Sequence, residues 1–321
     1  MKPYSILSYS FWKCYWITAR PYLMFLSGIS GVVGVAYSGG NIFELKGILL
    51  FISFFISYGV GQALTDVFQT DTDSISSPYR PLTQGLISKK QVFLVSLLGL
   101  SLCGIILTLG NILNLWLAVA SVLGLISYTY FKRRWWGGPF WNSWIVALLP
   151  IMGALSFNHA GQTVSQVVVS ILPLIVSVFF SYAIFVLLGY FKDISADRQT
   201  GYNTMLVVFG WEKSVIVSFL YFLASAIGSY LFIKQFSFHL LSLIVWGAGV
   251  LYLLYSHYLM MKIRDENQAH FSIAYVVRGY VWLHAGEIMF IRQEISWTAF
   301  SLIYLILFEL VLRIRPEVKQ I

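Results

Sequence analysis

Two acidic segments stand out in a chain of 321 residues that has only 13 Asp and Glu residues. The first contains Asp66, Asp71 and Asp73, and the second contains Asp193 and Asp197. Each follows a strongly apolar run, and ionisable groups at a membrane span are costly and tend to mark a functional site. Carboxylate oxygens suit Mg²⁺, and magnesium often links them to a phosphorylated substrate. The two segments therefore predict a divalent-cation site for a phosphorylated molecule.

The first acidic segment is followed by a turn that contains an arginine. On a continuous helix, Asp66, Gln69 and Asp73 share one face, whereas Asp71 points about 140° away from Asp66 unless the helix unwinds. Two prolines fix the turn and place Arg80 near these acids, where its guanidinium suits a pair of diphosphate oxygens. The alternative interpretation of Arg80 is an ordinary arginine in a basic loop.

In the second segment, Asp193 and Asp197 are spaced i, i+4 and share a helix face. Like charges at this spacing destabilise a helix, so a bound cation is the natural compensation. Each segment taken alone could also hold helix-capping or solvated carboxylates. Two such segments on one membrane face favour the metal site.

The composition places these residues in a membrane protein. The chain is 58% hydrophobic and 11% charged, with a mean hydropathy of +0.77, whereas soluble domains have about 25% charged residues. Its length suits about nine helices of roughly 20 residues, so we expect a single all-α membrane-embedded domain over residues 1–321. Residues 1–19 lack the pattern of a cleaved signal peptide. Cys14 and Cys103 are expected to pack as thiols and to form neither a disulfide nor a zinc site.

Nine apolar runs have the length of a membrane span: 21–38, 46–65, 91–110, 113–131, 140–157, 164–191, 214–233, 238–261 and 296–312. Residues 271–291 are also apolar but contain Arg278, His284 and Glu287, so they are expected either to lie at the interface or to form a further, polar-lined span. His284 and Glu287, at i and i+3, could form a general-base pair or simply hydrogen-bond within the packing.

Lys and Arg concentrate in every second loop. Most of them lie in residues 66–90, 132–134, 192–213 and 262–267, and few lie in the loops at 39–45, 111–112, 158–163 and 234–237. By the positive-inside rule, the basic loops and both acidic segments face the cytoplasm. The net charge of +8 follows from this asymmetry, and we expect no nucleic-acid partner because the basic residues form no single stripe.

The second acidic segment resembles a motif of the UbiA-type intramembrane prenyltransferases. That motif has the form Asp-x-x-x-Asp-x-x-x-Gly-x-x-Thr-x-x-Val-x-x-Gly. The chain matches it at Asp193, Asp197, Gly201, Thr204, Val207 and Gly210.

The first segment resembles the other motif of this family, Asn-Asp-x-x-Asp-x-x-x-Asp, with an Arg-Pro pair after it. Thr65 replaces the Asn, and Gln69 replaces the middle Asp, whose charge Asp71 could supply from a shifted position. Looser matches are Ala19-Arg20-Pro21 and the segment that contains Tyr128 and Lys132. The matched positions of the motif itself are Asp66, Asp73, Arg80 and Pro81.

The resemblance implies a bundle of about nine transmembrane helices around a central cavity. There, two Mg²⁺ ions would bind an isoprenyl diphosphate whose tail lies in an apolar tunnel. It implies metal binding by Asp66, Asp71, Asp73, Asp193 and Asp197, and catalysis by the same aspartates except Asp71, together with Arg80. It implies contacts to the diphosphate, or to the metal ligands, by Gln69, Tyr128, Lys132, Lys192 and Arg198.

We therefore expect a magnesium-dependent prenyltransferase that ionises an isoprenyl diphosphate and passes the prenyl group to a hydrophobic acceptor within the lipid membrane. The acceptor could be a phenol, a quinone precursor, a tetrapyrrole or a lipid alcohol. One alternative is a membrane terpene cyclase, which quenches the cation intramolecularly. Another is a cation-coupled transporter, because paired intramembrane acids are also typical of transporters. The Arg-Pro pair and the Gly and Thr positions favour an enzyme, since cation binding alone does not require them.

Overall fold

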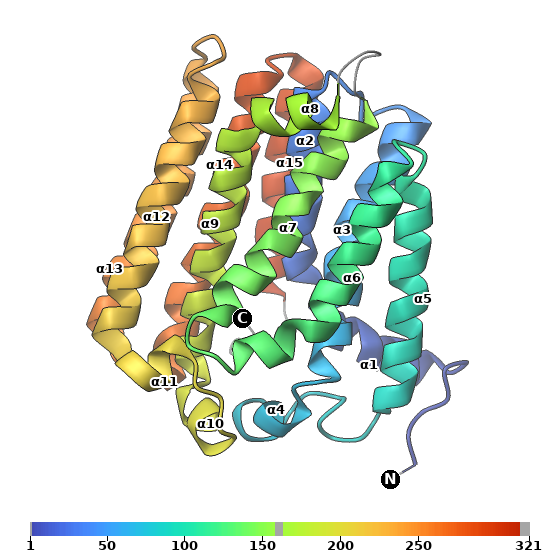
Figure 1. Ribbon diagram of the computed structural model, residues 1–321, viewed down its shortest axis with the longest axis vertical. Helices are drawn as coiled ribbons and strands as arrows, with labels where there is room; N and C mark the ends of the chain where they lie inside the picture. Colours follow the sequence, from blue (N-terminus) through green and yellow to red (C-terminus); the bar gives the residue numbers. More distant parts are fainter. Residues whose placement is uncertain (1, 158–162, 315–321) are drawn as a thin grey trace.

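The computed structural model describes residues 2–157 and 163–314, and these form an all-α bundle (Figure 1). The long helices run roughly parallel to one axis, while the short helices α4, α10 and α11 gather at one end and α8 lies at the other. Most of the expected loop 158–163 lies outside the described residues. The helices are α1 Tyr9–Ala19, η1 Pro21–Leu23, α2 Met24–Tyr37, α3 Leu45–Asp66, α4 Thr70–Ser76, α5 Lys89–Leu107, α6 Leu113–Lys132, α7 Gly137–Ser156, α8 Val164–Ser170, α9 Leu172–Gly189, η2 Tyr190–Lys192, α10 Ile194–Gln199, α11 Met205–Phe209, α12 Trp211–Ile233, α13 Leu240–Ile263, η3 Glu266–Gln268, α14 Ala269–Ile291 and α15 Ile295–Arg313.

Within the described residues, eight helices are long and apolar enough to cross a membrane. A ninth span is obtained when Tyr9–Ala19 and Pro21–Tyr37 are taken together across a bend of 45°. The bend falls at Arg20, which has the left-handed φ of 51°, and Pro21 begins the next helical turn. The described chain is therefore a multi-pass membrane bundle, as its composition predicts.

Helix α14 corresponds to the segment whose placement the sequence left open. Its 23 residues include 18 that are buried, and it packs along α13 and against α2 and α9. Arg278 on this helix forms a bidentate ion pair with Glu309 of α15, with an Nε to Oε1 distance of 2.9 Å. Residues 271–291 thus lie inside the bundle, and not along one end of it, because their polar groups have partners there.

Close packing around α2 depends on residues without side-chain bulk. A Cβ atom on Gly31 would lie 2.2 Å from the ring of Phe54, and one on Gly34 would lie 2.1 Å from the carbonyl oxygen of Pro150. Thirteen of the fourteen residues of α2 are buried. Small residues allow this approach in a bundle where lipid removes the hydrophobic drive between helices.

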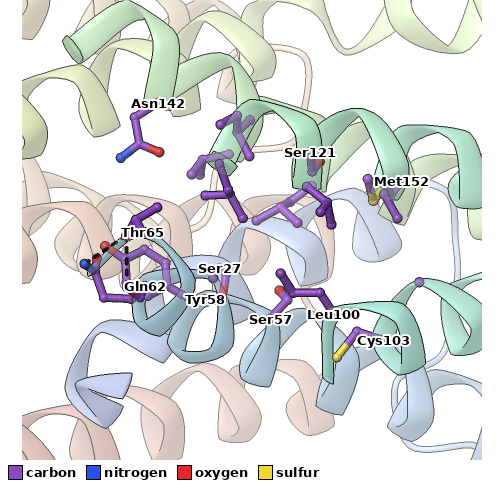
Figure 2. A pocket seen from close by; sticks show the side chains of 18 of the residues that line it. Ser27, Ser57, Tyr58, Gln62, Thr65, Leu100, Cys103, Ser121, Asn142 and Met152 are labelled. Atoms are coloured by element: carbon purple, nitrogen blue, oxygen red, sulfur yellow. Dashed lines mark hydrogen bonds between the residues drawn. The ribbon is translucent and has the colours of Figure 1, made fainter. Parts of the chain in front are cut away.

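The interior holds an apolar cavity between α3, α5, α6 and α7 (Figure 2). Gln62, Thr65 and Asn142 lie at one end of it, and Cys103 and Met152 lie at the other. Most of the remaining lining is aliphatic. An apolar cavity within a membrane bundle suits a hydrocarbon chain.

Candidate active site

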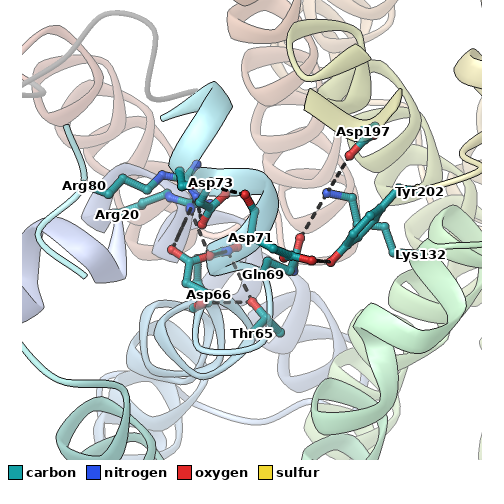
Figure 3. A network of polar contacts seen from close by, with 12 residues as sticks. Arg20, Thr65, Asp66, Gln69, Asp71, Asp73, Arg80, Lys132, Asp197 and Tyr202 are labelled. Atoms are coloured by element: carbon teal, nitrogen blue, oxygen red, sulfur yellow. Dashed lines mark hydrogen bonds and ion pairs between the residues drawn. The ribbon is translucent and has the colours of Figure 1, made fainter. Parts of the chain in front are cut away.

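The first acidic segment does not form the continuous helix that its spacing predicts. Helix α3 ends at Asp66, Gln69 has φ −119°, and α4 begins at Thr70. The break still leaves Asp66 and Asp73 close to one cation, Arg80, but it turns Asp71 away from them (Figure 3). The break therefore divides the acids of the first segment into an inner pair, Asp66 and Asp73, and an outer residue, Asp71.

The inner pair is held by two buried arginines. Arg20 Nη2 lies 2.7 Å from Asp66 Oδ2, and Arg80 Nη1 lies 2.5 Å from Asp73 Oδ2 and 3.8 Å from Asp66 Oδ2. Gln62 Nε2 also donates to Asp66 Oδ1 at 2.8 Å. The acids thus have more neutralising neighbours than the sequence suggested. The sequence alone assigns no role to Arg20, because its side chain reaches Asp66 only through the bend after α1.

Asp71 and Arg198 are both exposed and lie outside the polar cavity that eight of the predicted residues line. Asp71 Oδ2 accepts a hydrogen bond from Arg133 Nη2 at 3.1 Å, and Asp71 Oδ1 accepts one from the Tyr202 hydroxyl at 3.2 Å. The structure therefore places Asp71 in a surface cluster that joins α4 to the loop after α10.

The second acidic segment reaches the first through a lysine. Lys132 Nζ, at the end of α6, lies 3.6 Å from Asp197 Oδ1 and donates to Gln69 Oε1 at 3.0 Å (Figure 3). Asp197 is fully buried, and neither of its carboxylate oxygens accepts a hydrogen bond from the described residues. This burial raises the pKa of Asp197 to about 6, and the positive charge of Lys132 limits the rise.

A polar cavity is lined by eight of the eleven predicted site residues. Arg20, which was not among them, also lines it. Asp197 does not line it and touches it only through Lys132. The eight residues are Asp66, Gln69, Asp73, Arg80, Tyr128, Lys132, Lys192 and Asp193.

The polar cavity adjoins the apolar cavity. Five residues line both: Tyr58, Gln62, Thr65, Asn142 and Tyr182. The Tyr182 hydroxyl donates to that of Tyr58 at 3.1 Å, and the two rings meet edge to face with centroids 6.3 Å apart. The site can therefore hold a molecule with an anionic head among four cationic side chains and a long apolar tail beyond two aromatic rings.

The donor set of the polar cavity fits magnesium in its chemistry. It includes the carboxylates of Asp66, Asp73 and Asp193, and Mg²⁺ takes oxygen ligands. The two oxygens of Asp197 are buried without hydrogen-bond donors, which is an arrangement that a cation relieves. Among the described residues, no three acidic, His or Cys side chains are already grouped closely enough to hold an ion, because Asp66 and Asp73 are paired with arginines.

His284 and Glu287 form a pair, but this pair lines neither of the two cavities. His284 Nδ1 lies 2.6 Å from Glu287 Oε2, and both side chains are fully buried. Glu287 Oε1 accepts hydrogen bonds from the hydroxyls of Ser177 and Ser229, which lie on α9 and α12. The pair therefore links α14 to α9 and α12, away from the predicted catalytic residues.

The chain matches the sequence pattern of the UbiA prenyltransferase family from residue 8 to residue 279, which is most of its length. The chain belongs to the UbiA prenyltransferase family. It is accordingly a membrane enzyme of the prenyltransferase class, and the transporter interpretation is wrong.

Several curated relatives of this UbiA-family chain carry one name. The digeranylgeranylglyceryl phosphate synthase of Thermococcus kodakarensis is 26% identical over 265 residues, which cover 78% of this chain and 88% of the relative. The synthase of the same name from Pyrococcus horikoshii is 28% identical over 222 residues, covering 67% of this chain and 76% of the relative.

Solved structures share the fold of this UbiA-family chain. A UbiA homologue from Aeropyrum pernix K1 superposes with a TM-score of 0.71 at 16% identity, covering 83% of this chain and 97% of the homologue. A UbiA homologue from Archaeoglobus fulgidus, bound to DMAPP and Mg²⁺, gives a TM-score of 0.61 at 16% identity, with coverages of 84% and 98%. The bundle architecture predicted from the sequence is thereby confirmed.

Proposed function

We propose that this UbiA-family enzyme ionises an isoprenyl diphosphate in a magnesium-dependent reaction and transfers the prenyl group to the hydroxyl of a phosphate-bearing membrane lipid. The observation that carries the proposal is the junction of a polar cavity, lined by four basic side chains and three aspartates, with an apolar cavity. Two relationships support it: the relatives are named digeranylgeranylglyceryl phosphate synthases, and the homologue from Archaeoglobus fulgidus is bound to DMAPP and Mg²⁺.

The cationic side chains of the polar cavity bind and orient the diphosphate. Arg80 and Arg20 present guanidinium groups that match pairs of phosphate oxygens, while Lys132 and Lys192 add point charges. Asp66, Asp73, Asp193 and Asp197 are the residues that would hold Mg²⁺, which would add to the charge neutralisation of the leaving group. The allylic C–O bond then breaks with both electrons passing to the diphosphate oxygen.

Tyr58 and Tyr182 lie where the resulting allylic cation forms, at the junction of the two cavities. Their aromatic faces stabilise positive charge, and the buried apolar wall excludes water that would otherwise capture the cation. The hydroxyl oxygen of the acceptor then forms the new C–O bond, its proton passes to the released diphosphate, and an ether and protonated diphosphate are the products. We further propose that the acidic segments face the cytoplasm, because their loops are rich in Lys and Arg.

The direct test uses the purified protein in lipid nanodiscs with magnesium and geranylgeranyl diphosphate. With a glyceryl phosphate lipid that has a free hydroxyl, we expect one prenyl ether for each diphosphate released. A cyclic hydrocarbon formed without any acceptor would establish the terpene cyclase instead. Prenylation of an added phenol, but not of the lipid, would show that the acceptor is a phenol and not a lipid alcohol. The absence of diphosphate release at every tail length would overturn the proposal.

A further inference from the structure

The connection between α13 and α14 lies against the second acidic segment. Helix α13 ends at Ile263, at the same end of the bundle as α10 and α11 (Figure 1). Arg264 then takes a left-handed φ of 49°, and the short helix η3 begins at Glu266. Helix η3 packs against η2, which ends directly before Asp193. A segment far along the chain thus contacts the stretch that carries two of the predicted metal ligands.

The contact is made by one carboxylate that accepts two hydrogen bonds. Ser195 N donates to Glu266 Oε2 at 3.0 Å, and the Ser195 hydroxyl donates to Glu266 Oε1 at 2.7 Å. Ser195 is the second residue of α10 and lies between Asp193 and Asp197. Backbone N–H groups in the first turn of a helix have no partner within that helix, and a carboxylate is a strong acceptor for them. Glu266 therefore fixes both the backbone and the side chain of the residue between the two acids.

Asp193 occupies the N-cap position of α10, where an aspartate commonly accepts a hydrogen bond from the second or third N–H of its own helix. In the described part of the chain, the Asp193 side chain makes no such bond and instead lines the polar cavity. Asp197 N donates to Asp193 O at 2.8 Å, so the backbone of this turn links the two acids. Glu266 thus supplies the cap that Asp193 would otherwise supply.

We infer that Glu266 is a positioning residue for the second acidic segment, because it caps α10 in place of Asp193 and so keeps the Asp193 carboxylate at the polar cavity. The inference rests on the proposed function, since it assigns Asp193 to magnesium. Glu266 lines neither cavity and acts only through Ser195. When Glu266 is removed, the Asp193 carboxylate stands at the capping position and turns to the Ser195 N–H, which takes it away from the metal.

The test compares Glu266→Ala with Glu212→Ala. Glu212 Oε1 lies 2.6 Å from Arg264 Nη2, so Glu212 also holds the connection between α13 and α14, but from α12, which carries none of the predicted metal ligands. The probe is Mn²⁺ in the presence of geranyl thiolodiphosphate, whose C–S bond resists ionisation, and free Mn²⁺ is measured by electron paramagnetic resonance. We expect Glu266→Ala to weaken Mn²⁺ binding about fivefold, the factor that the loss of one helix cap produces. Glu212→Ala should leave the affinity unchanged, since an exposed pair contributes little.

Two further measurements separate positioning from a merely structural role. The magnesium concentration for half-maximal turnover should rise in Glu266→Ala by the same factor as the Mn²⁺ dissociation constant, while turnover at saturating magnesium stays near that of the wild type. In chelator, the thermal unfolding midpoint of Glu266→Ala should stay close to that of the wild type, because Asp193 restores the cap. A merely structural role would lower this midpoint and would lower turnover at every magnesium concentration.

Glu266→Gln is the conservative variant. Its carbonyl oxygen still accepts one of the two hydrogen bonds, so Mn²⁺ binding should weaken by a smaller factor, about twofold. If Glu266→Ala does not fold, this variant decides the test, and wild-type affinity in Glu266→Gln would then overturn the inference.

Two other results would overturn the inference and leave the proposed function intact. One is an Mn²⁺ affinity in folded Glu266→Ala equal to that of the wild type. The other is an equal loss of affinity in Glu212→Ala, because it would show that any tether of this connection has the same effect. If the wild type binds no Mn²⁺ with the analogue and releases no diphosphate from the substrate, the proposed function itself is wrong.

Discussion

Lys132 and Asp197 form an ion pair that connects the two acidic segments, with 3.6 Å between Lys132 Nζ and Asp197 Oδ1. The same ammonium group donates to Gln69, so one lysine contacts a residue from each segment. A second link is the 3.1 Å contact between the hydroxyls of Thr72 and Thr200. The two segments, far apart along the chain, therefore pack against each other beside the polar cavity.

The buried carboxylate of Asp197 predicts a pH-dependent stability of the metal-free protein. Its pKa is raised to about 6, so the folded state holds the proton more tightly than the unfolded chain does. Protonation of Asp197 therefore stabilises the folded state. This stabilisation is fully present below the ordinary pKa of an aspartate and is lost as the pH rises through about 6. In chelator, the unfolding midpoint of the wild type should fall over this interval relative to that of Asp197→Asn. Parallel curves for the two proteins would contradict the assignment.

Replacing Arg80 with Ala should lower the rate of diphosphate release by about 100-fold or more, since this side chain is placed to stabilise charge on the leaving group. Arg80 is buried and lines the polar cavity. The matched control is Arg198→Ala, which removes an exposed arginine outside the cavity and should change the rate by less than about threefold. Similar losses in the two variants would show that Arg198 also reaches the substrate.

Gln69 and Asp71 give opposite predictions for magnesium dependence. Gln69 lines the polar cavity, so Gln69→Asp adds a carboxylate there and should lower the magnesium concentration needed for half-maximal rate. Asp71 points to Arg133 and Tyr202 at the surface, so Asp71→Asn should leave that concentration unchanged. A metal titration of both variants decides the matter. A severe defect in Asp71→Asn would show that Asp71 turns inward during the reaction.

Glu287→Gln should destabilise the protein by about 3 kcal/mol, because breaking a buried pair leaves its partner unsatisfied. The turnover of the molecules that remain folded should be unchanged, since the His284 to Glu287 pair lines neither cavity. Glu294→Gln is the control, because Glu294 pairs with Arg292 at the surface and such pairs contribute about 0–1 kcal/mol. Thermal unfolding and rates per folded molecule separate these effects. A rate loss without destabilisation would favour the general-base interpretation.

The proposed orientation predicts that both acidic segments are accessible from one side of the membrane. Ser74 and Gln199 are exposed and lie in α4 and α10. A single cysteine at either position, in a protein without Cys14 and Cys103, should react with an impermeant maleimide only when the cytoplasmic face is open. Labelling of the two positions from opposite faces would refute a common orientation.

The sequence predicts the bundle well because lipid requires long apolar helices, and their lengths and loop charges are local properties. Eight of the eleven site residues predicted from the sequence line the polar cavity, because the motifs name the residue types that the chemistry needs. It does not predict the break between Asp66 and Thr70, because a continuous helical spacing fits the same letters. Arg20 and Glu266 are missed for another reason: their partners are distant in sequence, so only the packed bundle brings them together.

Most residues line only one of the two cavities, so substitutions can change one cavity without changing the other. The ionising groups lie at helix ends and in short connecting segments, whereas Leu107, Ala118 and Met152 lie on other stretches of α5, α6 and α7. A substitution affects both cavities only at the five residues that line both: Tyr58, Gln62, Thr65, Asn142 and Tyr182. A mutational library restricted to residues that line only the apolar cavity can therefore vary that cavity without replacing any charged residue of the polar one.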